Sequence, residues 1–167
     1  MTHPAAPDTP VVIHRPVGPP SAVLLDSPHS GFAFPDDFAP VAPLAALRTT
    51  WDAHVEALWS GAPGVGATLL AATFPRCYVD VNRAETDLDP ALLAEPWDGP
   101  LAPTDYSVRG MGLIRRDALP GVPMYDAPLP AAAVRARLAR WYAPYRSAVA
   151  QEIADGWDVH GSVWHLN

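Results

Sequence analysis

Short runs of consecutive apolar residues alternate along the chain with longer stretches in which apolar residues have helical spacing. The run at 22–26 has the continuous pattern of a buried strand, as found in parallel or mixed sheets. Further runs predict strands at 11–14, 67–72 and 77–81, and 161–167 begins as another. Strands that alternate with helical stretches predict an α/β domain.

Two stretches have the period of an amphipathic helix. One covers 43–60, and a longer one covers 131–154, where Pro144 should kink or split the helix. In the first stretch Asp52 lies about 100° round the helix axis from Trp51. Asp52 is therefore at the edge of the apolar stripe, where it faces either a cleft or solvent.

The remaining stretches are irregular. Residues 84–128 are rich in Asp, Pro and Gly and show little periodicity, so we expect functional loops there, with a short hairpin around 112–116. Residues 1–10 are small, polar and proline-rich, and they predict a disordered tail. Residues 11–167 then form one domain.

Composition narrows the possible partners. The formal net charge of −7 argues against nucleic acid and against an anionic membrane surface. No apolar run approaches the ~18–20 residues that a membrane span needs. The single cysteine, Cys77, excludes an internal disulfide and suits a reducing cytoplasm. It lies in an apolar run without an adjacent base, which predicts a buried hydrophobic residue and not a nucleophile.

Three segments carry candidate chemistry. His29 follows the strand at 22–26 within Ser-Pro-His-Ser-Gly, where it is a metal ligand, a general base or a residue that caps a backbone group. Asp52 belongs to a run of alternating polar residues with His54 and Glu56, which is most often a solvated helix face. The third segment is basic and surrounds the apolar run at 77–81.

Arginines flank the apolar run at 77–81. Arg76 precedes it and Asn82-Arg83 follow it. Arginines at such positions either pair with acidic neighbours or hold a carboxylate through two parallel N–H···O bonds, which lysine does not reproduce. The pattern alone leaves both readings open.

Taken together, several segments of the chain resemble the N-formylglutamate amidohydrolase family in order and spacing. The resemblance covers roughly residues 11–167, and its segments are LLDSPHSGFAFP, TTWDAHVEALW, FPRCYVDVNR, RGMGLIRRDALPGVPMYDAPL, RLARWYAPYR and GSVWHLN. The family is similar in fold to zinc carboxypeptidases and aspartoacylases. The resemblance thus implies a mixed sheet flanked by helices, with zinc at the strand ends.

The resemblance also implies roles for five residues. His29 matches the first zinc ligand, and Asp52 is the candidate for the carboxylate ligand. Arg76 resembles the arginine that polarises the scissile carbonyl, while Asn82 and Arg83 match the pair that holds the substrate carboxylate. The implied reaction is zinc-dependent hydrolysis of N-formyl-L-glutamate, a small anionic N-acyl amino acid, to glutamate and formate in histidine degradation.

The chain also departs from the family pattern. The family usually has histidine where this chain has Arg146, and a segment like GSVWHLN is normally followed by a Cys-His-Ser-Met stretch that carries the third zinc ligand. A later glutamate is the expected general base. We therefore expect this chain to be about the first two-thirds of the enzyme, to bind zinc weakly and to show little or no activity. His165 shares the strand face of the expected third ligand but lies ~13 Å from it, too far to replace it.

Two alternatives remain open. One is a truncated, catalytically inactive remnant that keeps the fold, and the other is an amidase for another N-acyl amino acid. A sheet edge exposed by a missing C-terminal part also predicts self-association.

Overall fold

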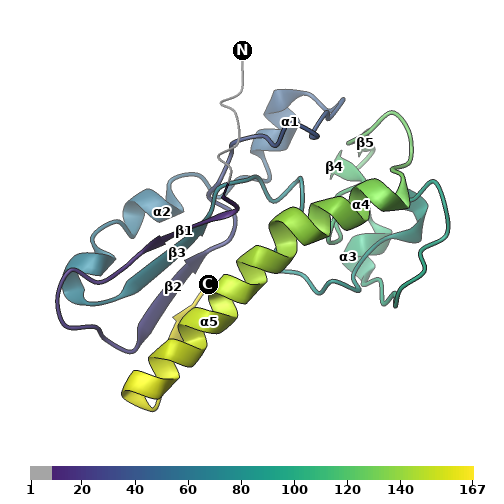
Figure 1. Cartoon of the computed structure of the whole chain (residues 1–167). Helices are drawn as coiled ribbons and strands as arrows, with labels where there is room; N and C mark the ends of the chain where they lie inside the picture. The colour runs from purple at the N-terminus through teal and green to yellow at the C-terminus, as the bar shows by residue number, and fades with distance from the viewer. Residues whose placement is uncertain (1–8) are drawn as a thin grey trace.

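A mixed sheet forms the centre of one half of the molecule. The computed structural model describes residues 9–167, and within them four strands form this sheet in the order β1-β3-β2-β6 (Figure 1). Strand β1 (Val11–His14) is antiparallel to β3 (Thr68–Ala72), whereas β2 (Val23–Ser27) is parallel to both β3 and β6 (Trp164–Leu166). The predicted α/β class, the mixed sheet and these four strands are confirmed. Of the predicted tail, residues 1–8 lie outside the described residues.

The helix predicted over 43–60 is wrong, because the chain breaks after one turn. Helix α1 (Leu44–Arg48) ends where the hydroxyls of Thr49 and Thr50 donate back to the carbonyls of Ala46 and Leu47, each at 2.7 Å. Such side-chain bonds compete with the helical ladder. A second helix, α2 (Val55–Leu58), begins only after His54, which has a left-handed backbone with φ 68°. The 3-10 turn η1 (Ala62–Val65) then leads into β3.

The strand predicted at 77–81 is also wrong, although the segment is as buried as its apolar residues suggest. Tyr78 N–H donates to Pro75 O at 2.9 Å in a turn, and Asp80 N–H donates to Leu113 O at 2.7 Å. Every residue from 77 to 81 is at most 1% exposed. An apolar run indicates burial but does not by itself distinguish a strand from a buried irregular segment.

The irregular region 84–128 holds short elements that support each other through buried carboxylates. Asp87 accepts hydrogen bonds from Ser107 Oγ, from Thr104 N–H and from Arg83, and Asp89 pairs with Arg116 at 2.7 Å. The hairpin expected around 112–116 lies further along the chain, and Met111 and Arg115 form only an isolated bridge. The elements are η2 (Pro90–Leu92), α3 (Asp105–Val108), β4 (Asp117–Leu119) and β5 (Val122–Pro123).

The long C-terminal helix connects the two halves of the molecule (Figure 1). It consists of α4 (Ala131–Arg137), a π-helical turn η3 (Leu138–Tyr142) and α5 (Ala143–His160), and α5 packs against β1 and β2. The helix is thus six residues longer than predicted, and it ends at Gly161 with φ 67°. The π turn lies just before Pro144, whose ring would clash with the carbonyl of a regular preceding turn. The backbone therefore switches there to the π hydrogen-bond pattern, and the helix continues beyond Pro144.

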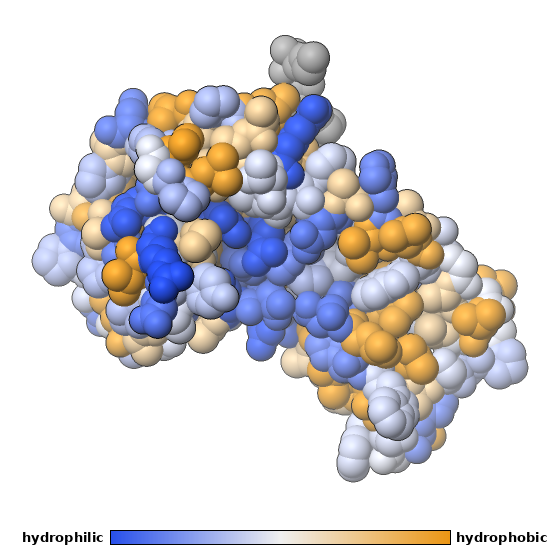
Figure 2. Space-filling view, turned by 180° about the vertical axis from the view of Figure 1, so that it is seen from behind, coloured by the Kyte–Doolittle hydropathy of each residue, from blue (hydrophilic) through white to orange (hydrophobic). Residues whose placement is uncertain are grey.

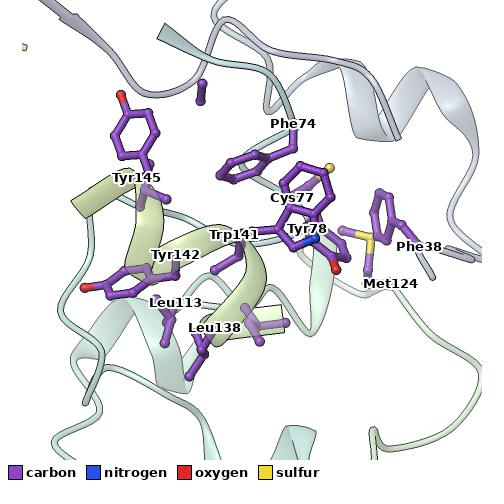
Figure 3. Packing of buried hydrophobic residues seen from close by; sticks show 14 of the residues in the cluster. Phe38, Phe74, Cys77, Tyr78, Leu113, Met124, Leu138, Trp141, Tyr142 and Tyr145 are labelled. Atoms are coloured by element: carbon purple, nitrogen blue, oxygen red, sulfur yellow. The ribbon is translucent and has the colours of Figure 1, made fainter. Parts of the chain in front are cut away.

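An aromatic core fixes this helix to the segment around Asp80. Figure 3 shows Phe74, Tyr78, Trp141 and Tyr145 gathered together, and the Trp141 ring meets Phe74 and Tyr78 edge-on at centroid distances of 5.2 and 6.0 Å. Such pairs add to the free energy gained by burial. The same core contains Cys77, which is fully buried, as expected. Burial raises the pKa of its thiol.

Strand β6 is the outermost strand on its side of the sheet as far as the described residues extend. Its side chains are exposed, with Trp164 at 70% and Leu166 at 48%. The self-association expected from an open edge stays a prediction. Among residues 9–167, no helix has both the length and the apolar character needed to cross a membrane.

Candidate active site

His29 lies between two carboxylates at the end of β2. Its Nε2 is 2.8 Å from Oδ1 of Asp80, and its Nδ1 is 3.2 Å from Oδ2 of Asp52. The break between α1 and α2 turns Asp52 towards this loop, where Asp52 N–H also donates to the carbonyl of His29 at 3.2 Å. The structure therefore brings the predicted pair, His29 and Asp52, together although the predicted helix around Asp52 does not exist.

Asp80 is the buried centre of the site. Its side chain is 1% exposed, and it accepts hydrogen bonds from Arg76 Nη2 at 2.6 Å and from Asn82 N–H at 3.1 Å, besides its contact with His29. Burial alone raises the pKa of this carboxyl. The hydrogen bond and charge of His29, together with Arg76, outweigh burial and lower the pKa of Asp80 to about 2. Asp80 therefore stays a carboxylate at neutral pH.

Both ring nitrogens of His29 face a carboxylate oxygen, so a cation is needed to satisfy both contacts. A neutral imidazole carries one N–H and can donate to only one of the two carboxylates. A proton or a metal ion shared by Nδ1 and Asp52 satisfies the other contact. Two ligands of a tetrahedral zinc with bonds of ~2.0–2.2 Å lie roughly 3.3–3.5 Å apart, close to the 3.2 Å between Nδ1 and Oδ2.

The donor set available for a metal is therefore a pair. In the part of the chain that the structure describes, no group of three or more His, Cys, Asp or Glu side chains converges as a metal site. His165 is engaged elsewhere, because its Nε2 lies 3.2 Å from Oδ2 of Asp26. The resemblance-based prediction that the third ligand and the general base lie beyond Asn167 stays a prediction.

The predicted arginines both lie beside Asp80. Arg76 reaches both carboxylates of the site, with Nη1 at 3.9 Å from Asp52 Oδ2. Arg83 lies with Nε at 3.7 Å from Asp80 Oδ2 and Nη1 at 3.2 Å from Asp87 Oδ2. Both readings of these arginines are thus compatible with the structure, since each has an acidic neighbour and each lies beside His29 or Asp80.

A cavity of about 250 Å³ opens beside His29 and Asp52, and Asp26, Val55, Trp59 and Asn167 also line it. The side-chain amide of Asn82 donates a hydrogen bond to Asn167 Oδ1, at 3.2 Å, and so contacts one of the residues that line this cavity. Figure 2 shows hydrophilic residues gathered in the hollow between the half that holds the sheet and the half that holds α3 and the β4–β5 hairpin.

Sequence reasoning missed two carboxylates of this site. Asp80 stands inside an apolar run, and a charged residue in such a run is a signal for a buried partner. Asp26 ends the buried run of β2 and is 4% exposed; it accepts hydrogen bonds from Tyr145 Oη and Asn167 Nδ2. Either residue was recognisable as a candidate by that rule.

The comparisons with known proteins agree with the resemblance. The sequence model of the N-formylglutamate amidohydrolase family matches residues 21–167. This chain belongs to that family. The N-formylglutamate deformylase of Pseudomonas aeruginosa PAO1 is 32% identical over an alignment of 156 residues, and the match covers 86% of this chain and 53% of that protein.

A solved family member has the same fold. The crystal structure of N-formylglutamate amidohydrolase from Ralstonia eutropha JMP134 matches with a TM-score of 0.93 and 44% sequence identity, over 95% of this chain and 57% of that one. The chain spans somewhat more than half the length of these two relatives.

Proposed function

We propose that the site around His29 belongs to a hydrolase that converts N-formyl-L-glutamate to L-glutamate and formate. The observation that carries the proposal is the buried histidine held between Asp52 and Asp80 beside Arg76, in a chain of this family. The names of both relatives specify N-formylglutamate. A role in histidine degradation and a cytoplasmic location remain predictions.

The proposed metal is zinc, held by Nδ1 of His29 and a carboxylate oxygen of Asp52 as in the zinc carboxypeptidase-like fold that the resemblance implies. When bound, zinc supplies a Lewis acid for the formyl oxygen and lowers the pKa of a coordinated water. The spacing of the two donors and the unsatisfied contact of His29 support this assignment.

Asp80 prepares His29 for that role. Because Asp80 stays ionised, it accepts the proton of Nε2 and leaves the lone pair of Nδ1 directed at Asp52. Carboxylates that hold the second nitrogen of a ligating histidine commonly fix both its tautomer and its ring orientation. Asp80 is thus a positioning residue for His29.

The arginines supply the positive charge that a dianionic substrate needs inside an acidic protein. Arg76 lies between the two carboxylates of the site, from which its guanidinium can stabilise charge that develops on the formyl oxygen. Arg83 and Asn82 are the proposed ligands of a substrate carboxylate. The Nε of Arg83 is buried and has no hydrogen-bond acceptor in the described residues.

Formate release from N-formyl-L-glutamate tests the proposal. It should be measured with added zinc for the 167-residue chain and for a chimera that joins it to the remaining residues of the Ralstonia protein. We predict zinc-dependent release by the chimera, abolished by His29→Ala. Release that is unaffected by this substitution overturns the proposal.

The alternative, an amidase for another N-acyl amino acid, is separated by the same assay. Faster hydrolysis of an N-acyl neutral amino acid than of N-formyl-L-glutamate would support this alternative.

A further inference from the structure

Three arginines with an unsatisfied donor lie close to Asp80. The Nε atoms of Arg76, Arg83 and Arg115 are all buried, and none has a hydrogen-bond acceptor within residues 9–167. Arg76 and Arg83 are predicted site residues, whereas Arg115 is not. The Nε of Arg137 is unpaired too, but that guanidinium donates to Tyr78 O and Tyr125 Oη. A bound anion would satisfy the donors of the three neighbouring cations.

The backbone brings Arg115 to this place. Asp80 N–H donates to Leu113 O at 2.7 Å, and Leu113 N–H donates to Asp87 O at 2.8 Å. The segment 111–115 closes on itself through the bridge between Met111 and Arg115. The loop that carries Arg115 is thus tied to the two acidic residues with which Arg83 also pairs.

Arg115 is the least compensated of the three cations. Arg76 pairs with Asp80 at 2.6 Å, and Arg83 pairs with Asp87 at 3.2 Å. Within the described residues the Arg115 guanidinium makes no hydrogen bond and no ion pair. Burial lowers its pKa first, and the charge of Arg76 lowers it further, while the charge of Asp80 acts in the opposite direction.

The charge balance favours an anionic ligand. Asp80 already accepts from His29, Arg76 and the Asn82 backbone, and Asp87 already accepts from Ser107 and Thr104 as well as Arg83. Neither has much capacity left for a third guanidinium. A half-buried cation without a counter-ion destabilises the fold, and an anion that pairs with it offsets this cost.

We propose that Arg115 binds the second carboxylate of the substrate and thereby makes the site specific for N-acyl amino acids with an acidic side chain. The inference rests on the proposed function, in which Arg83 and Asn82 take the first carboxylate. One guanidinium for each carboxylate matches the bidentate geometry that arginine offers.

Binding to metal-free protein tests this inference without turnover. The two probes are N-formyl-L-glutamate and N-formyl-L-glutamine, which have nearly the same shape and differ by one negative charge. Arg115→Gln should weaken binding of the glutamate probe about tenfold or more, the range for a lost charge-assisted hydrogen bond, and binding of the glutamine probe less than about twofold.

Arg109→Gln is the matched control. Arg109 is exposed on the neighbouring helix end, so the variant loses the same formal charge outside the cluster. It should change binding of neither probe. Arg115→Lys is a second variant for the case in which Arg115→Gln fails to fold. The ammonium of lysine keeps the charge but cannot make the two parallel hydrogen bonds of a guanidinium. This variant should also weaken binding of the glutamate probe selectively.

The inference is overturned if both probes lose affinity equally, if neither changes, or if the unmodified chain binds neither. Its failure is distinct from failure of the proposed function. The latter shows as absent formate release in the zinc-loaded chimera, whereas selectivity for the dianion is read with no metal present.

Discussion

The imidazole of His29 lies 2.8 Å from the carboxylate of Asp80, a residue 51 positions further along the chain and only 1% exposed in its side chain. This contact joins the end of β2 to the buried segment after β3. It leaves one nitrogen of His29 free to face Asp52. The orientation of His29 therefore depends on a buried carboxylate from a distant part of the chain.

Replacing Asp80 with asparagine should weaken zinc binding. The amide keeps the size of the side chain but removes the charge that holds the Nε2 proton, and loss of such a partner commonly costs about 10–100-fold in metal affinity. Competition with a chromophoric chelator measures the affinity. Asp98→Asn is the control, since Asp98 is an exposed carboxylate paired with Arg135. Equal affinities for the Asp80 variant and the unmodified chain would contradict the positioning role.

Asp80 should also make stability depend on pH in the acid range. Its pKa is lowered from 3.8 to about 2 on folding, so its contribution of roughly 2 kcal/mol is present above pH ~4 and is lost as the pH falls towards 2. The difference in unfolding free energy between the unmodified chain and Asp80→Asn should narrow by that amount over this range. Urea unfolding at pH 6 and at acid pH measures it. A difference that is constant with pH would show that the carboxylate is not stabilised by its neighbours.

Gly31 should tolerate no side chain. A Cβ added there would overlap backbone atoms of Ala72 and Thr73 at the end of β3, whereas a Cβ added at Gly64 would meet open space. Backbone atoms cannot rotate away, so Gly31→Ala should displace the loop that carries His29 and cost about 1–3 kcal/mol of stability. Thermal unfolding of the two alanine variants tests this, with Gly64→Ala near the unmodified midpoint. Equal midpoints would mean that the loop has more room than the structure indicates.

The regular part of the fold could be predicted from sequence because its signals are local. Runs of apolar residues predicted β2 and β3, and helical spacing predicted the long helix. The break after α1 depends on hydroxyls of Thr49 and Thr50 that bond backwards and on the left-handed His54. The irregular segment at 77–81 is buried by distant residues such as Trp141. Neither feature has a periodic signature.

The candidate site could be predicted only in part, for the same reason. His29 and Asp52 came from a family resemblance, since their spacing alone left other readings open. Asp80 was recognisable only as a charge within an apolar run, and its partners could not be predicted. They come from segments far apart in the chain, as the hydrogen bond from Asp80 N–H to Leu113 O illustrates.

The central claim is that His29 and Asp52 jointly hold the metal of an N-formylglutamate hydrolase. Its most direct test is zinc-dependent formate release by the chimera carrying either Asp52→Asn or Glu56→Gln. Glu56 lies four residues further along, in α2, and pairs with the surface residue His14 at 3.1 Å, so it controls for loss of an acidic side chain from this region. The account predicts that Asp52→Asn reduces turnover about 100-fold or more, as expected when a ligand of a three-ligand zinc site is lost, while Glu56→Gln leaves turnover unchanged. Full turnover by the Asp52 variant would contradict the account.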